Sequence, residues 1–206
     1  MKIKICGISN LADARFAAAA GADMLGYIQY RDSPRYTHPD LVAEINAWVI
    51  GPESVGVFVD EDVDTVNQIA ETAGFDFVQL HGSETVLMCE AVKCSVIKAF
   101  RVPETASTDD LRRQIEPYLD CVEYILLDTY SREKHGGTGM TFPWKIAREL
   151  ASEFPVLLAG GLNPENIREA ISTVHPAGVD ASSKLEESPG IKDFEKVTRF
   201  IEQARK

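Results

Sequence analysis

The sequence contains no C-x-x-C motif, no run of basic residues and no long apolar stretch. Its 206 residues include 21 Lys or Arg against 32 Asp or Glu, so the formal net charge is −11. Sequence-independent binding of nucleic acid or of anionic lipid needs clustered cations, so we expect neither partner. No segment of about 18 uncharged apolar residues exists, which predicts no transmembrane helix. Asp13 and Arg15 interrupt any apolar region of a signal peptide, and we expect a cytoplasmic protein.

Metal-binding and disulfide patterns are absent as well. The cysteines and histidines are dispersed along the chain at Cys6, Cys89, Cys94 and Cys121 and at His38, His81, His135 and His175. Structural zinc sites usually combine two closely spaced pairs of such residues, so we expect no metal. A reducing cytosol disfavours disulfides. Cys6 should therefore be a free thiol, either an inert buried residue or a reactive one.

What the chain does contain is a regular alternation of apolar runs and amphipathic segments. The apolar runs are KIKIC, MLGYI, SVGVFV, FDFVQL, SVIKAF, YILLD, PVLLAG and GVDAS. Near-continuous apolar strands are typical of a parallel sheet that is covered on both faces. Eight strand–helix units at a repeat of about 26 residues predict a single-domain (β/α)8 TIM barrel over residues 1–206. The alternative, a doubly wound open sheet, usually carries G-x-G-x-x-G after its first strand, and CGISN lacks that spacing.

Several helix starts can be predicted from capping residues. Asp62 precedes the third expected helix and Ser83 precedes the fourth. In NPENI, Asn163 can accept from free backbone N–H groups and Pro164 suits a first helical position.

The active site of a TIM barrel lies where the strands end, and Cys6 and Asp128 both stand at such ends. Burial raises the pKa of a carboxyl group, as a general acid near neutral pH requires. Asp128 is thus a candidate acid, and the alternative is a cap for the loop that follows. Arg35, in the loop after the second strand, could bind a carboxylate or phosphate through its planar fork, or it could be a solvated loop residue.

Two further strand ends carry polar candidates. Gln79 and His81 end the fourth strand, where His81 could contact a ligand or satisfy a hydrogen bond of the core. The seventh strand ends in Gly160 and Gly161 and the eighth in Ser182 and Ser183, and the loops after strands 7 and 8 form the recurrent phosphate site of this fold. We also expect a helix directly after the glycine pair, whose amino terminus would favour an anion. The long loop 129–141, with KHGGTGM, is a candidate lid.

Together these motifs resemble the phosphoribosylanthranilate isomerase family. The matching segments follow the family order along essentially the whole chain: KICGI, SPR, VGVFV, QLHG, IKAFRV, LLD followed by GGTG, LAGGLNPENI, GVDASS and SPGIKD. The resemblance implies an Amadori rearrangement in tryptophan biosynthesis, from N-(5-phosphoribosyl)anthranilate to 1-(2-carboxyphenylamino)-1-deoxyribulose 5-phosphate, without metal or cofactor.

The resemblance also implies roles for individual residues. Cys6 corresponds to the family's base, Asp128 to its acid and Arg35 to the arginine that contacts the anthranilate carboxylate. The phosphate loops correspond to Gly160, Gly161, Ser182 and Ser183. Because a free thiol is only a few per cent thiolate at pH 7, we expect some lowering of the Cys6 pKa.

The chain departs from the family pattern at Gln29, Pro143 and Lys184. These departures concern substrate affinity and identity rather than the catalytic pair. The alternatives are another sugar-phosphate isomerase or epimerase on the same barrel, or a non-catalytic barrel that binds a phosphorylated ligand. In each case the partner is a phosphorylated small molecule, and the chain is a monomer or a homodimer.

Overall fold

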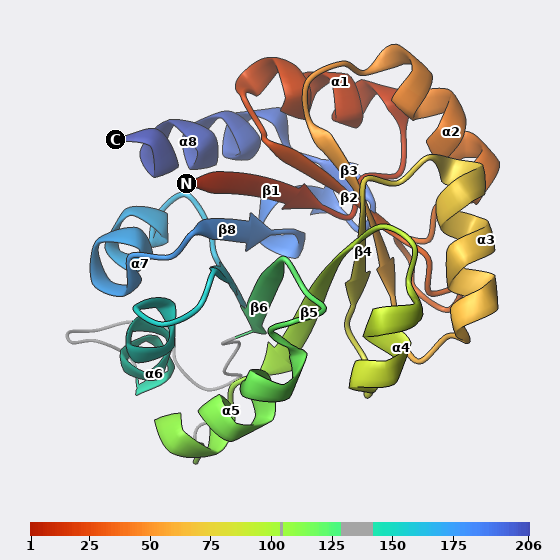
Figure 1. The fold of residues 1–206 in the computed structure, drawn as a ribbon. Coiled ribbons are helices and arrows are strands. Elements are labelled where there is room, and N and C mark those ends of the chain that lie inside the picture. Colours follow the sequence, from red (N-terminus) through yellow and green to blue (C-terminus); the bar gives the residue numbers. More distant parts are fainter. Residues whose placement is uncertain (104, 129–141) are drawn as a thin grey trace.

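Eight parallel strands close into a barrel in the computed structural model, which describes residues 1–103, 105–128 and 142–206 (Figure 1). Each strand pairs with its neighbours in sequence, and β8 pairs with β1 to complete the ring. The barrel strands are β1 (Lys2–Cys6), β2 (Met24–Ile28), β3 (Glu53–Phe58), β4 (Phe77–Leu80), β5 (Ser95–Arg101), β6 (Tyr124–Asp128), β7 (Val156–Ala159) and β8 (Gly178–Ala181). The predicted fold class is confirmed.

Helices alternate with the strands and surround the barrel (Figure 1). They are α1 (Leu11–Ala20), α2 (Pro39–Trp48), α3 (Val63–Ala73), α4 (Val86–Ala91), α5 (Thr108–Ile115), α6 (Phe142–Ala151), α7 (Ile167–Val174) and α8 (Phe194–Arg205). Two short 3-10 helices, η1 (Glu116–Tyr118) and η2 (Ser183–Leu185), interrupt this alternation. A small antiparallel hairpin after β8, which was not predicted from the sequence, is formed by β9 (Glu186–Ser188) and β10 (Ile191–Lys192). Of the described helices, none is long and apolar enough to cross a membrane.

Two apolar cores result from the alternation of side chains along each strand. One fills the barrel interior and consists of Met24, Val55, Phe77, Ile97, Ala99, Leu126, Leu157 and Ala159. The other lies between the strands and the helices and includes Ile3 and Ile5 of β1. Since both faces of every strand are covered, the strands read as near-continuous apolar runs in the sequence.

Helix boundaries were predicted less well than strands. Asp62 is the N-cap of α3, as expected, and its side chain accepts a hydrogen bond from the N–H of Thr65. The expected start at Ser83 is wrong, because α4 begins at Val86 and Thr85 is its cap. The N–H of Ser83 instead donates to the carboxylate of Asp60 at 2.6 Å, which holds the residue in the preceding turn.

The expected helix start in NPENI is also displaced. The side-chain oxygen of Asn163 accepts from the N–H groups of Glu165 and Asn166 at 2.9 and 3.0 Å, but these bonds close a turn and not a helix. The helix itself, α7, begins at Ile167. It therefore does not follow directly on the glycine pair at the end of β7.

The two ends of the chain meet at the start of the barrel. Lys2 of β1 stands opposite Gly178 of β8. The guanidinium of Arg205, near the end of α8, donates to the backbone oxygen of Met1 at 3.2 Å and to the carboxylate of Asp23 at 2.6 Å. Figure 1 shows the N and C labels near each other.

Candidate active site

A cavity of about 380 Å³ opens at the carboxyl ends of the barrel strands. Every residue proposed from the sequence lines it: Cys6, Arg35, Gln79, His81, Asp128, Gly160, Gly161, Ser182 and Ser183. They come from five of the eight strand ends and from the loop after β2, so the closure of the barrel is what brings them together. The candidate lid, 129–141, lies outside the described residues, as does the side chain of Pro143.

Cys6 ends β1 with its side chain against the barrel interior, and it is only 6% exposed. Gly7 then takes a left-handed conformation, φ 76°, which favours glycine and turns the chain away. Across the β1–β2 pair, a Cβ at Gly26 would lie 2.7 Å from the Cys6 sulfur and 3.0 Å from the Lys4 ammonium. The absence of a side chain at Gly26 thus gives both groups their space.

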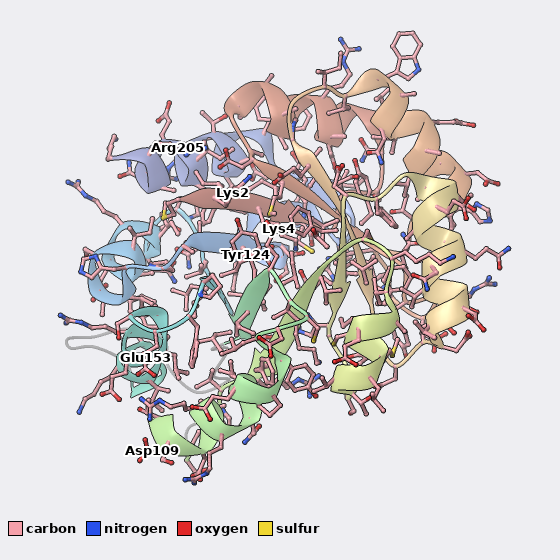
Figure 2. The ribbon with its side chains drawn as sticks, in the orientation of Figure 1. Lys2, Lys4, Asp109, Tyr124, Glu153 and Arg205 are labelled. Carbon is pink, nitrogen blue, oxygen red and sulfur yellow. The ribbon has the colours of Figure 1, made fainter. Side chains whose placement is uncertain are left out.

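The most important site residue that sequence reasoning missed is Lys4. It is fully buried, and its ammonium donates to the carboxylate of Asp180 on β8 at 2.9 Å. Figure 2 shows Lys4 among the barrel strands, whereas Asp109, Glu153 and Arg205 lie at the periphery. A signal was present in the sequence, since residues two apart on a strand share a face and Lys4 stands two before Cys6.

The ionisation of Cys6 is set by opposing influences. Burial raises the pKa of the thiol, the ammonium of Lys4 lowers it, and the carboxylate of Asp180 raises it. The net direction of the Cys6 pKa shift is upward, opposite to the lowering expected from the sequence, because the desolvation of the buried sulfur outweighs the nearby cation. Two cations limit this rise in the Cys6 pKa, and Lys4 has a larger effect than Lys192.

We expect Lys4→Met to raise the pKa of Cys6 and Asp180→Asn to lower it, because the two changes remove opposite charges beside one sulfur. Iodoacetamide reacts with the thiolate, so the pH at which Cys6 is alkylated should move up in the first variant and down in the second. Mass spectrometry of the Cys6 peptide separates this labelling from that of the other thiols. Lys4→Met should also lower the free energy of unfolding by roughly 3–5 kcal/mol, since Asp180 loses its buried counter-charge. Shifts in the same direction would contradict these assignments.

Asp128 ends β6 near two polar residues of the β4 end, Gln79 within β4 and His81 directly after it. Its side chain is 28% exposed, so the desolvation expected from its apolar neighbours in sequence is partial. The imidazole Nε2 of His81 lies 3.8 Å from the Asp128 carboxylate. The side-chain nitrogen of Gln79 lies 2.8 Å from Nδ1 of the same ring. With the Gln79 amide donating, the ring proton is on Nε2 and faces Asp128.

Arg35 reaches the cavity rim from the loop after β2, and it is neither fully solvated nor free. Its guanidinium makes a bidentate pair with the carboxylate of Glu186 on β9, with Nε to Oε1 at 2.8 Å and Nη2 to Oε2 at 2.7 Å. Its side chain remains 22% exposed and lines the cavity. Glu186 could not be predicted as a site residue from the sequence, because only the hairpin after β8 brings it back toward the β2 loop.

The expected phosphate loops lie side by side at the ends of β7 and β8. Gly160 and Gly161 have φ values of 98° and 71°, in the left-handed region that favours glycine. Ser182 is half-buried and Ser183 is exposed. The expectation that a helix starts directly after the glycines is wrong, because α7 begins at Ile167, so the glycines and serines offer an anion backbone and hydroxyl groups and no helix amino terminus.

Two of the departures from the family pattern can now be placed. Lys184 is exposed in η2 and lines the cavity beside the serines. Gln29 is buried just after β2, and its side chain donates to the backbone oxygen of Thr37 at 3.2 Å. Gln29 does not line this cavity. In the described part of the chain, no three His, Cys, Asp or Glu side chains are grouped so that they could hold a metal ion.

Comparisons with known proteins agree on one family. The family model for N-(5′-phosphoribosyl)anthranilate (PRA) isomerase matches residues 3–203. An N-(5′-phosphoribosyl)anthranilate isomerase of Geobacter sp. (strain M21) is 45% identical, with 100% of this chain and 98% of the relative covered.

Solved structures give the same result. The phosphoribosyl anthranilate isomerase of Thermotoga maritima superposes with a TM-score of 0.88 at 38% identity, covering 100% of this chain and 98% of its own. Another phosphoribosyl anthranilate isomerase, solved in complex with reduced 1-(o-carboxyphenylamino)-1-deoxyribulose 5-phosphate, has a TM-score of 0.86 at 35% identity, with coverage of 100% and 98%.

Proposed function

The chain belongs to the N-(5′-phosphoribosyl)anthranilate isomerase family, and from this premise we propose that the cavity at the carboxyl ends of its strands is the active site. The reaction is the isomerisation of N-(5-phosphoribosyl)anthranilate in tryptophan biosynthesis. The observation that carries the assignment of the site is that a thiol, a carboxyl group, an arginine and two glycine- or serine-bearing strand ends line one cavity. We further propose that residues 1–206 act as one barrel domain.

Asp128 is the general acid in this proposal. Transfer of its proton to the ring oxygen of the ribose breaks the bond between C1 and that oxygen, and the anthranilate nitrogen supplies electrons to form an iminium. The carboxyl group lies in the cavity and is partly accessible, which is consistent with direct contact with a ligand. His81, beside it, orients the group and contacts the substrate together with Gln79.

Cys6 is the general base. Its thiolate removes the proton from C2 of the iminium, which yields an enolamine, and the enolamine tautomerises to the ketone. Only the thiolate form of the sulfur is basic enough for this step. Because burial raises the pKa of Cys6, the ammonium of Lys4 supports the reaction by stabilising the thiolate.

The remaining residues bind the two anionic ends of the substrate. Arg35 binds the anthranilate carboxylate with the planar fork that suits such groups. The phosphate is bound by the strand ends that carry Gly160, Gly161, Ser182 and Ser183. All steps are proton transfers and bond shifts within one molecule, so we propose that the reaction requires no cofactor.

The proposal is tested with the purified chain and N-(5-phosphoribosyl)anthranilate. Turnover should appear as a loss of the substrate's fluorescence, and it should persist after dialysis against a chelator. No turnover of this substrate would contradict the proposed function. Turnover that the chelator abolishes would contradict the independence from metal.

A further inference from the structure

The hairpin after β8 has no role in the proposed reaction, yet its two strands carry buried charges directed at the cavity rim. Glu186 of β9 has a side chain that is 4% exposed and Lys192 of β10 one that is 1% exposed. The ammonium of Lys192 donates to Oε1 of Glu186 at 2.9 Å. Both oxygens of the Glu186 carboxylate also accept hydrogen bonds from Arg35. Charged groups are buried in this way only where they are paired and hydrogen-bonded.

The contact between Glu186 and Arg35 uses one particular edge of the guanidinium. A guanidinium offers two edges for bidentate binding, one formed by Nε with Nη2 and the other by Nη1 with Nη2. Glu186 takes the first edge through Nε and Nη2. Arg35 lines the cavity, whereas Glu186 does not. The second edge is therefore the one left for a ligand in the cavity.

Arg35, Glu186 and Lys192 form a cluster of charged groups, and its charges favour an anion at the second edge of Arg35. Burial raises the pKa of Glu186, but hydrogen bonds from Arg35 and Lys192 outweigh it and hold the pKa below its ordinary value. The carboxylate is thus ionised, and it stands between two cations. Lys192 offsets its negative charge, so the positive charge of Arg35 is not cancelled.

The cluster is also held rigidly by the first helix. The backbone N–H of Lys192 donates to the carboxylate of Asp13 on α1 at 2.9 Å. Asp13 is itself buried. The position of Glu186 is therefore fixed through Lys192 of β10 and Asp13 of α1, on the side away from Arg35.

We infer that Glu186 is a positioning residue which presents the second edge of Arg35 to the carboxylate of the substrate. Lys192 offsets the negative charge of Glu186, so that the positive charge of Arg35 remains available to the substrate. The inference rests on the proposed function, because it assumes a substrate that carries a carboxylate. It assigns specificity for that carboxylate to a residue outside the cavity. A bound carboxylate would then meet an arginine whose fork is already oriented, which reduces the entropy lost on binding.

The test is Glu186→Gln, with Glu187→Gln as the matched control. The control removes the same charge from the neighbouring residue of β9, whose side chain is exposed. In Glu186→Gln one of the two acceptor oxygens becomes a donor nitrogen, and a single amide oxygen cannot hold both Nε and Nη2 of Arg35, so the bidentate pair is lost. We expect KM for N-(5-phosphoribosyl)anthranilate to rise roughly tenfold, the effect of losing one charge-assisted hydrogen bond, with kcat changed less than about twofold. Glu187→Gln should match the wild type.

Two competitive inhibitors locate the effect. Reduced 1-(o-carboxyphenylamino)-1-deoxyribulose 5-phosphate carries both the carboxylate and the phosphate, whereas ribulose 5-phosphate lacks the carboxylate. Only the first should bind Glu186→Gln more weakly, and adding Glu186→Gln to Arg35→Met should cause no further loss. Equal weakening of both inhibitors, a loss confined to kcat, or a fall in KM would overturn the inference.

Two further measurements keep the result unambiguous. If Glu186→Gln folds poorly, Glu186→Asp retains the charge and withdraws the carboxylate by one methylene, so the same selective rise in KM should appear in smaller form. Wild-type turnover is measured in parallel. Its absence would refute the proposed function and with it this inference, whereas wild-type turnover with an unselective variant would refute the inference alone.

Discussion

Cys6→Ser is expected to lose turnover by ~10²–10⁴-fold, the usual effect of removing a general base, while substrate binding survives. A serine hydroxyl fills nearly the same space but is far too weak an acid to form the needed anion beside Lys4. The sulfur is almost completely buried beside Gly26, so the smaller oxygen should disturb the packing little. Single-turnover assays with excess enzyme separate the chemical step from binding.

The matched control is Cys94→Ser. Cys94 is a free, half-buried thiol that directly precedes β5, at the amino end of the barrel and away from the cavity. It should retain wild-type turnover. If Cys6→Ser were equally active, Cys6 would be an inert filler of the barrel and another base would have to be sought.

Asp128→Asn is expected to reduce kcat by a similar ~10²–10⁴-fold, because the amide keeps the shape of the side chain and cannot donate the carboxyl proton. Since the side chain is partly exposed, the free energy of unfolding should change by only about 0.5 kcal/mol. Steady-state kinetics and thermal unfolding of the same sample measure the two effects.

Asp120→Asn serves as the control for this prediction. Asp120 is exposed and lies before the amino end of the same strand, β6. Its variant should keep both kcat and stability. A variant of Asp128 that loses stability but keeps kcat would show that the carboxylate only caps the loop.

A site residue could be predicted from the sequence when its position follows from the strand that carries it. Cys6 and Asp128 could be located because each directly follows an apolar run, and the barrel fold then places every strand end at one face. The position of Lys4 follows from the same two-residue alternation. Its partner does not, because Asp180 lies 176 residues away and the contact exists only once the barrel closes.

The residues that could not be predicted are those placed by loops. The charge of Arg35 is evident in the sequence, but its partner Glu186 depends on a hairpin of seven residues with no strong strand pattern. The starts of α4 at Val86 and of α7 at Ile167 were missed because Ser83 and Asn163 belong to turns: the backbone N–H of Ser83 donates to the distant carboxylate of Asp60, and the side chain of Asn163 accepts from the N–H of Glu165. Turn and cap chemistry use the same side chains, and only the following backbone distinguishes them.

The pairing of β1 with β8 has a consequence for how the chain reaches this structure. During synthesis β1 has an unpaired edge until β8, which ends at Ala181, has been formed. An open strand edge is a template for pairing with other chains, so the growing polypeptide carries an aggregation hazard through most of its synthesis. Closure also joins the two most distant parts of the sequence, and topologies rich in such contacts fold slowly. A chain cut before β8 would therefore leave an open sheet with two reactive edges and not a smaller barrel.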